Sequence, residues 1–130
     1  MSELARLDSH RVGPVQHVAV TGEVDLSNAQ PLLDGVAAAV PDDVAHVVLD
    51  LTHTTYLDSA GIAALFRLAE RLRLRRQDLR LVVPPHSPIR PVLRLTRLDH
   101  VIPVDDTPPG SGPPDSPLPG SDSLGAPETT

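Results

Sequence analysis

The sequence predicts a small α/β sandwich with one mixed, mostly parallel sheet of about five strands and three to four helices. The first observation is periodicity: within residues 1–104, apolar side chains recur either every second residue or every three to four residues, as in alternating strands and helices. The second is order: two strand-like segments precede three repeats of helix then strand, and strands joined through helices run parallel. The third is size, because 130 residues that are 40% hydrophobic suit one domain with a tail.

The N-terminal part of the chain is expected to form a hairpin. Residues 3–10 predict a weak first strand, and residues 15–22 predict a buried second strand because both faces of that segment carry apolar side chains. Gly13-Pro14, between the two, is a turn signal. This hairpin supplies the antiparallel part of the sheet.

Residues 25–40 predict the first helix. Apolar side chains recur at helical spacing from Leu26 onward. Ser27 or Asn28 would cap the helix, since short polar side chains at that position accept a hydrogen bond from the first turn. Pro31 is tolerated only near the helix start, which fixes where the helix begins.

The remaining elements follow in alternation. Residues 44–51 are too short for a helix with flanking turns and predict a central strand buried on both faces. Residues 59–76 predict an amphipathic helix, and residues 79–83 predict a further strand. Prolines near its start place a third helix at about residues 88–98. Residues 101–104 then close the sheet as a short edge strand, where a proline needs no ladder donor.

Composition excludes several classes of function. There is no Cys, which excludes disulfides, thiol catalysis and cysteine-based metal clusters. The six His are scattered without metal-ligand spacing, so we expect no metal and no cofactor. Aromatic residues make up 2% of the chain and the net charge is −6, which argues against nucleic-acid binding. All basic residues are arginines, and their cluster in residues 67–80 is interpreted as a solvated helix face.

The composition changes abruptly at Asp105. Residues 105–130 are rich in Pro, Gly and Ser and hold five acidic residues but no basic one. Such a segment buries too little apolar surface to offset its ordering entropy, so we expect a domain over residues 1–104 followed by a disordered tail. Neither a signal-peptide layout nor an apolar run of membrane-spanning length is present, and we expect a cytoplasmic protein that binds no membrane.

The stretch around Ser59 carries the chemistry that the sequence suggests. Asp58 and Ser59 fall where a strand's loop turns into a helix, and ligands and reacting groups favour that end of parallel strands. One interpretation is structural: Asp58 or Ser59 caps the helix, while Gly61 lets neighbouring backbone approach closely. The other is that Ser59 is phosphorylated, which would place about two negative charges at a potential contact surface. A catalytic serine is disfavoured because the G-x-S-x-G elbow is absent.

Two motifs in order then identify a family resemblance. VTGEVDLSNAQPL, residues 20–32, and VVLDLTHTTYLDSAGIAAL, residues 47–65, resemble the STAS-domain family, specifically the bacterial anti-sigma factor antagonists. The resemblance covers roughly residues 3–104. It implies a regulatory binding protein, not an enzyme, that frees a sigma factor by binding an anti-sigma factor. That partner is often a serine kinase, which phosphorylates the antagonist and releases it, and a metal-dependent serine phosphatase resets the cycle.

The resemblance also assigns residues. The position of the phosphoacceptor is Ser59, directly after Asp58, and Ala60 stands where the family often has a second Ser or Thr. Asp25 matches the acidic residue near the phosphoacceptor. The implied partner-binding residues lie in the loop from Asp25 to Asn28 and in the start of the following helix: Asp25, Ser27, Asn28, Asp58, Ser59, Ala60, Gly61, Ile62 and Leu65. An alternative remains open, in which the chain is a STAS subunit of a transport or stress-signalling assembly without a phosphorylation cycle.

Overall fold

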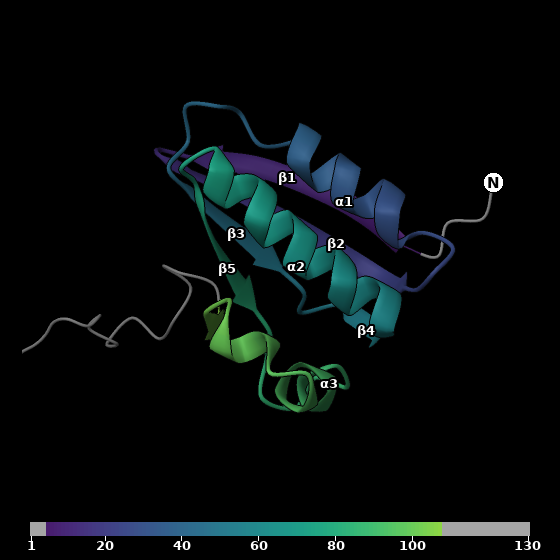
Figure 1. Ribbon diagram of the computed structural model, residues 1–130. Helices are drawn as coiled ribbons and strands as arrows, with labels where there is room; N and C mark the ends of the chain where they lie inside the picture. Colours follow the sequence, from purple (N-terminus) through teal and green to yellow (C-terminus); the bar gives the residue numbers. More distant parts are fainter. Residues whose placement is uncertain (1–4, 108–130) are drawn as a thin grey trace, which may run out of the picture.

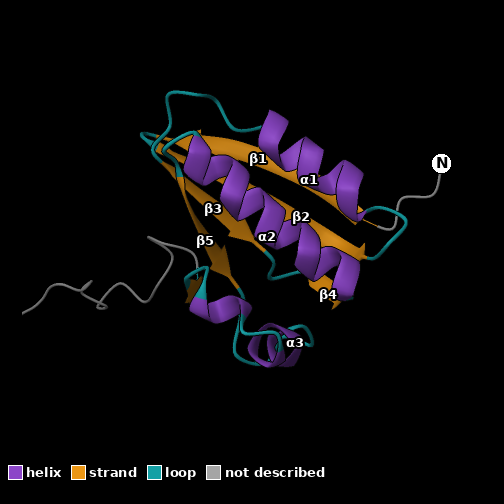
Figure 2. Ribbon diagram, in the orientation of Figure 1, coloured by secondary structure: helices purple, strands orange, loops and turns teal. Residues whose placement is uncertain are grey.

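The structure is a computed structural model that describes residues 5–107. One six-stranded sheet forms a single curved layer, and two helices lie side by side across one of its faces (Figures 1 and 2). The chain runs through the elements in this order: β1 (Ala5–Val12), β2 (Val15–Val24), α1 (Ala29–Ala38), β3 (His46–Asp50), β4 (Thr54–Leu57), α2 (Ser59–Leu74), β5 (Asp78–Val82), α3 (Arg90–Leu95), the 3-10 helix η1 (Leu98–His100) and β6 (Val104–Asp105). The mixed, mostly parallel α/β sheet that the sequence predicts is confirmed.

The sheet is built around β2. Its strand order is β1-β2-β3-β5-β6, with β1 antiparallel to β2 and all other pairings parallel. The N-terminal hairpin turns through Gly13, whose φ of +59° suits a residue without a Cβ. On its other side, β2 pairs with β3 over Val15–Ala19 and with β4 over Gly22–Val24, with a register shift between Gly22 and Glu23. β2 therefore pairs with two later strands, β3 and β4, along the same edge.

The core lies between the sheet and the helix pair. Alternate residues of the central strands, such as Val18, Leu49 and Leu81, are almost fully buried beneath Leu68 and Leu72 of α2. Burying a Val or Leu side chain contributes about 1.5–3 kcal/mol, so this layer of aliphatic side chains supplies most of the core's stability, and the partly buried Phe66 packs against it. The structure thus agrees with a core of Val, Leu, Ile and Ala.

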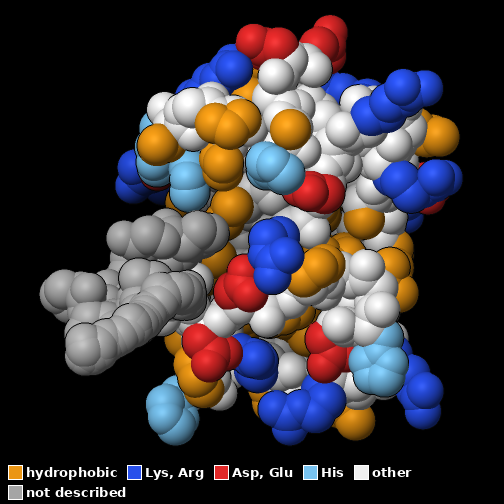
Figure 3. Space-filling view, turned by 90° about the vertical axis from the view of Figure 1, so that its left-hand side faces the viewer, with side chains coloured by type: hydrophobic (Ala, Val, Ile, Leu, Met, Phe, Trp, Pro, Cys, Tyr) orange, Lys and Arg blue, Asp and Glu red, His pale blue; other side chains and the backbone are white. Residues whose placement is uncertain are grey.

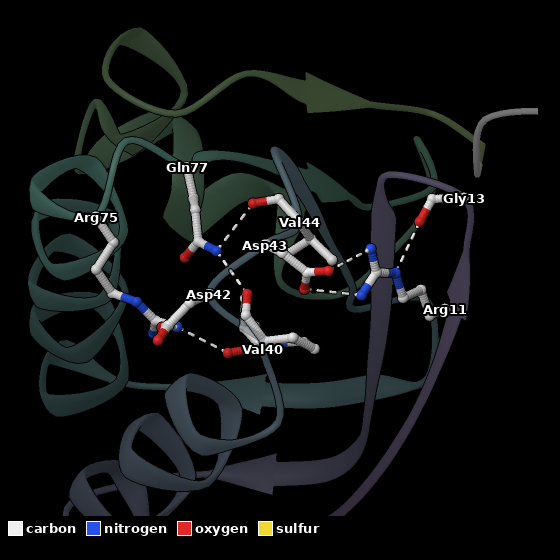
Figure 4. A network of polar contacts seen from close by, with 9 residues as sticks. Arg11, Gly13, Val40, Asp42, Asp43, Val44, Arg75 and Gln77 are labelled. Atoms are coloured by element: carbon white, nitrogen blue, oxygen red, sulfur yellow. Dashed lines mark hydrogen bonds and ion pairs between the residues drawn. The ribbon is translucent and has the colours of Figure 1, made fainter.

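Polar side chains fasten the ends of α1 and α2 together (Figure 4). Arg75 donates hydrogen bonds to the carbonyl oxygen of Ala37, in the last turn of α1, and to that of Val40, just beyond the helix, at 3.3 and 2.8 Å. The buried Gln77 donates from Nε2 to the carbonyls of Pro41 and Val44. Elsewhere on the seam, Arg71 pairs with Asp34 of α1 at 2.9 Å. Most of the arginine cluster is exposed, as expected of a solvated face, and several of its members also tie α2 to α1.

Several element boundaries differ from the sequence prediction, among them β1 at Ala5–Val12 instead of 3–10 and α1 at Ala29–Ala38 instead of 25–40. Three further differences follow. The first is β4, a sixth strand that the periodicity did not indicate. The second is the last strand, which lies at Val104–Asp105 instead of 101–104, since Pro103 and its neighbours form the turn that leads into it. The third is α3, which is shorter than 88–98 because Arg97 adopts a left-handed conformation, with φ of +60°, and the chain continues as η1.

The folded domain extends past the residue at which the composition changes. Asp105, assigned to the tail from its neighbours, lies in β6, and its carboxylate pairs with Arg80 at 2.8 Å. Hydrogen bonding to the Arg80 guanidinium lowers the pKa of Asp105 below its ordinary value. Asp106, also assigned to the tail, pairs with Arg90 at 3.1 Å, and residues 108–130 of the predicted tail lie outside the described residues.

Candidate functional site

Two strand ends bring the predicted site residues together. Val24, the last residue of β2, is the register partner of Leu57, the last residue of β4. Because the two strands are parallel, the segments that follow them leave the sheet at the same edge. The Asp25–Asn28 loop therefore lies beside Asp58 and the start of α2.

Asp58, and not Ser59, caps α2. Its Oδ1 accepts hydrogen bonds from the backbone N–H groups of Ala60 and Gly61, at 3.0 and 3.1 Å. Ser59 is the first residue of the helix and is exposed. Within the part of the chain that the structure describes, its hydroxyl makes no hydrogen bond. The structural and the functional interpretation of this stretch thus fall on different residues, with Asp58 as the cap and Ser59 free to react or to contact a partner.

Side-chain hydrogen bonds hold the loop from Asp25 to Asn28 in one conformation. Asp25 Oδ1 accepts from the Ser27 backbone N–H at 2.9 Å and from the Ser27 hydroxyl at 2.6 Å. Asn28 Oδ1 accepts from the Asp25 N–H at 2.9 Å, and its Nδ2 donates to the Glu23 carbonyl at 2.8 Å. The Ser27 hydroxyl is the main reason why the pKa of Asp25 lies below its ordinary value. Asp25 is therefore held as a carboxylate in a loop with little freedom.

Leu26 is a surface residue in this loop. The sequence pattern placed it on the apolar stripe of the first helix, which was wrong: α1 begins at Ala29, and Leu26 is 83% exposed. Asn28 is the N-terminal boundary residue of α1, but its side chain bonds backward into the loop and makes no cap bond to the helix. The predicted capping by Ser27 or Asn28 is thus replaced by an Asp25-centred turn that presents a leucine to solvent.

Gly61 lies in close packing with side chains, not with backbone as the sequence suggested. A Cβ at this position would lie 2.4 Å from Leu57 Cδ1 and 3.2 Å from Val24 Cγ1, so side chains and not backbone fill the space. Of the other predicted partner-binding residues, Ala60 is half-buried, whereas Ile62 and Leu65 are only 6% and 8% exposed. Ile62 and Leu65 therefore pack inside the domain and position the surface without forming it.

The charges at the site are acidic. Glu23, Asp25 and Asp58 belong to the segments that meet here, and no arginine occurs in residues 23–28 or 58–66. A helix N-terminus attracts anions through its free N–H groups. In α2, however, two of these groups already bond to Asp58 Oδ1, and Ile62 N donates to the Asp58 carbonyl. A phosphate on Ser59 would gain little compensation within the domain and would act mainly outward.

Three other kinds of feature bear on function among the described residues: groups of metal ligands, membrane-spanning helices and a cavity beneath α1 and α2. Among residues 5–107 there is no group of three or more His, Cys, Asp or Glu side chains arranged to hold a metal ion. No helix in the same range is long and apolar enough to cross a bilayer. A cavity of about 40 Å³ lies between α1, α2 and the sheet, and aliphatic residues and Gly61 line it. Such a cavity lacks the convergent polar groups of a ligand site.

Comparison with known proteins agrees with this architecture. A protein-family model described as "Mlab, STAS domain" matches residues 2–103. The crystal structure of an anti-sigma factor antagonist from Mycobacterium paratuberculosis is 28% identical, with a TM-score of 0.69, and the match covers 79% of this chain and 86% of that one. The anti-sigma factor antagonist SpoIIAA in its unphosphorylated form is 15% identical, with a TM-score of 0.61 and coverage of 76% and 87%. The phosphorylated form of SpoIIAA, a Bacillus cell fate determinant, is also 15% identical, with a TM-score of 0.56 and coverage of 76% and 90%. At that identity, the likeness to SpoIIAA concerns the fold.

Proposed function

This chain belongs to the STAS-domain family, and from that premise we propose that it is an anti-sigma factor antagonist that phosphorylation of Ser59 switches off. The observation that carries the proposal is the free, exposed hydroxyl of Ser59 at the first position of α2, next to a residue that already caps the helix. Its function is binding and not catalysis. The similarity to the antagonist from Mycobacterium paratuberculosis supports the same proposal.

The unphosphorylated chain binds the anti-sigma factor through the joined ends of β2 and β4. The contact surface comprises the loop of Asp25, Leu26, Ser27 and Asn28 together with Asp58, Ser59 and Ala60, while Gly61, Ile62 and Leu65 support it from below. An exposed leucine on a hydrogen-bonded loop offers apolar contact area, and a rigid loop loses little conformational entropy on binding. Binding displaces the sigma factor from the anti-sigma factor.

Phosphorylation ends the interaction. A phosphate adds about −1.5 to −2 charges at pH 7, next to Asp58 and near Asp25. The first-turn amides that would otherwise receive it are occupied by Asp58. Repulsion and desolvation therefore fall on the partner interface, and the isolated domain changes shape little. The partner is an anti-sigma factor of the serine kinase type, and a metal-dependent serine phosphatase restores the hydroxyl.

Intact-mass spectrometry of the protein from its own cells, before and after phosphatase, is the first test. We expect one phosphate, which fragmentation places on Ser59. Binding to the cognate anti-sigma factor, once identified, is then measured for Ser59→Ala, which is expected to bind, and for Ser59→Asp, which is expected to bind more weakly by at least tenfold. Ser9→Asp, at an exposed position of β1, is the matched control. Equal affinity of both Ser59 variants would overturn the switch.

A second function is favoured by one finding, the description "Mlab, STAS domain" of the matching family model. In this alternative, the chain is a constitutive STAS subunit of a transport or stress-signalling assembly. It would then bind its partner with or without charge at position 59, and Ser59 would carry no phosphate under any growth condition. The same mass measurement and the same variants therefore distinguish the two functions.

A further inference from the structure

A second surface lies along the other end of α2. A groove of about 700 Å³ passes over the edge of β5, between the later turns of α2 and the segment 101–103. Figure 3 views the molecule from the side on which β5 lies in Figure 1, and hydrophobic surface alternates there with arginine and acidic side chains. Phe66, Leu79 and Val101 contribute apolar lining, and Val101 is 61% exposed. This surface is distinct from the Ser59 site.

The edge of β5 within this groove lacks a complete strand partner. Pairing with β6 begins only at Leu81, whose N–H donates to the carbonyl of Pro103 at 2.8 Å. Pro103 has no N–H to return to the carbonyl of Leu79. Among residues 5–107, the outward backbone of Leu79 thus has no neighbouring strand. An open edge of this kind accepts an added extended segment.

The rim of the groove carries three arginines, and one of them is not engaged. Arg73 pairs with Glu70 at 2.6 Å, and Arg80 pairs with Asp105 at 2.8 Å. Arg76 is exposed and forms no ion pair within the described residues. It also has a φ of +60°, a conformation that usually selects glycine. Arg76 therefore places a guanidinium at the groove, although glycine would suit its backbone conformation better.

We propose that this groove binds residues 120–126 of the same chain, with Asp122 paired to Arg76 and Leu124 against Phe66. Residues 108–130 contain three acidic residues and no basic one. Within them, 120–126 is the longest stretch without proline, so it can donate backbone N–H groups to an open edge. Asp122 and Leu124 are two residues apart and share a face of an extended segment. The acidic side chain and the apolar side chain thus match the two kinds of lining in the groove.

The covalent connection makes this docking feasible. The described part of the chain ends at Thr107. This residue follows directly after β6, the strand that borders the groove. The twelve residues from 108 to 119 include six prolines, and a proline-rich chain extends by about 3.1 Å per residue, about 37 Å in all, enough to return along β5. A short tether gives an effective concentration in the millimolar range, so a contact with an intrinsic dissociation constant of about 1 mM is substantially occupied. Because the charged pair is exposed, added salt weakens it.

Paramagnetic relaxation in the full chain tests the proposal directly. The protein contains no Cys, so Thr129→Cys provides a unique site for a nitroxide label close to the docking segment. We expect the amide signals of Phe66, Leu79 and Val101 to lose about half of their intensity or more, while those of Ser59 to Ile62 keep theirs. The loss should diminish in Arg76→Gln and Asp122→Asn. Arg94→Gln and Asp115→Asn remove the same charges outside the proposed contact and should leave it unchanged.

Three results would overturn the inference. The first is equal signal loss at the groove and at the Ser59 site, which indicates an undocked tail. The second is a loss that Arg76→Gln and Arg94→Gln reduce to the same extent, which indicates attraction by overall charge. The third concerns a mixture of two chains, one that carries the isotope but no nitroxide and one that carries the nitroxide but no isotope. Signal loss in the isotope-labelled chain of this mixture would indicate that the tail of a second copy occupies the groove. None of these results bears on Ser59, so this proposal and the proposed function fail separately.

Discussion

Replacing Asp58 separates the two interpretations of the Ser59 stretch. Asp58→Ala removes the acceptor of two backbone N–H groups at the start of α2, at 3.0 and 3.1 Å. Loss of a side-chain cap costs about 1 kcal/mol, and loss of a carboxylate at the positive end of a helix costs about 0.5 kcal/mol more. Asp58→Asn keeps an acceptor oxygen and loses only the charge. We therefore expect destabilisation by about 1.5 kcal/mol for Ala and about 0.5 kcal/mol for Asn.

Urea denaturation followed by circular dichroism measures both values. With a slope of about 1.5 kcal/mol per molar urea, the midpoint should fall by about 1 M in Asp58→Ala and by about 0.3 M in Asp58→Asn. Asp8→Ala, an exposed position on β1, controls for the loss of a surface carboxylate. Equal destabilisation by Ala and Asn would refute the capping argument, because the effect would then be electrostatic. With the cap intact in Asp58→Asn, the repulsion between residue 58 and a phosphate on Ser59 can be measured separately.

Three further variants test other parts of the structure. Val36→Ile adds one methylene to the cavity of about 40 Å³ between α1 and α2 and should stabilise the fold by about 1 kcal/mol in the same assay; a loss of stability would show that the cavity is not available. Arg76→Gly relieves the positive φ and should raise stability by about 1 kcal/mol, whereas a decrease would show that the backbone there is unstrained. Burial, and to a smaller extent the stacked His10 ring, lower the pKa of His17, while Asp50 raises it. The unfolded chain thus takes up the proton first, and stability should fall as pH drops below about 6.5. His17→Gln should reduce the difference in urea midpoint between pH 7.5 and 5.5, and an unchanged difference would contradict the assignment.

The periodicity of the sequence was sufficient for the sheet and the two long helices but not for β4. Residues 44–51 form a buried strand because aliphatic side chains fill both faces, a pattern that hydropathy detects. Thr54–Leu57 is a strand because its backbone pairs with Gly22–Val24, some 30 residues earlier, across a register shift. A four-residue segment whose pairing depends on a distant partner leaves little local signal.

The site was predictable in chemistry and less so in geometry. The motifs placed Asp25, Asp58 and Ser59 together, and the parallel ends of β2 and β4 do bring them to one edge. The sequence could not decide between Asp58 and Ser59 as the cap, since both residue types cap helices and only the backbone direction selects one. It also misassigned Leu26, because a leucine at helical spacing looks the same whether the helix starts before it or after it. The hydrogen bonds of Asp25 decide that question.

The one-sided pairing of β4 has a consequence for local opening. β3 lies between β2 and β5, whereas β4 pairs with β2 alone among the described residues. Detaching β4 and the first turn of α2 would therefore break few ladder hydrogen bonds, and the central strands would remain intact. In amide hydrogen exchange, this segment should exchange well before Val47 to Leu49 and should behave as a separate low-stability unit. Such an opening would release the amides of Ala60 and Gly61 from the Asp58 carboxylate while the rest of the domain stays folded.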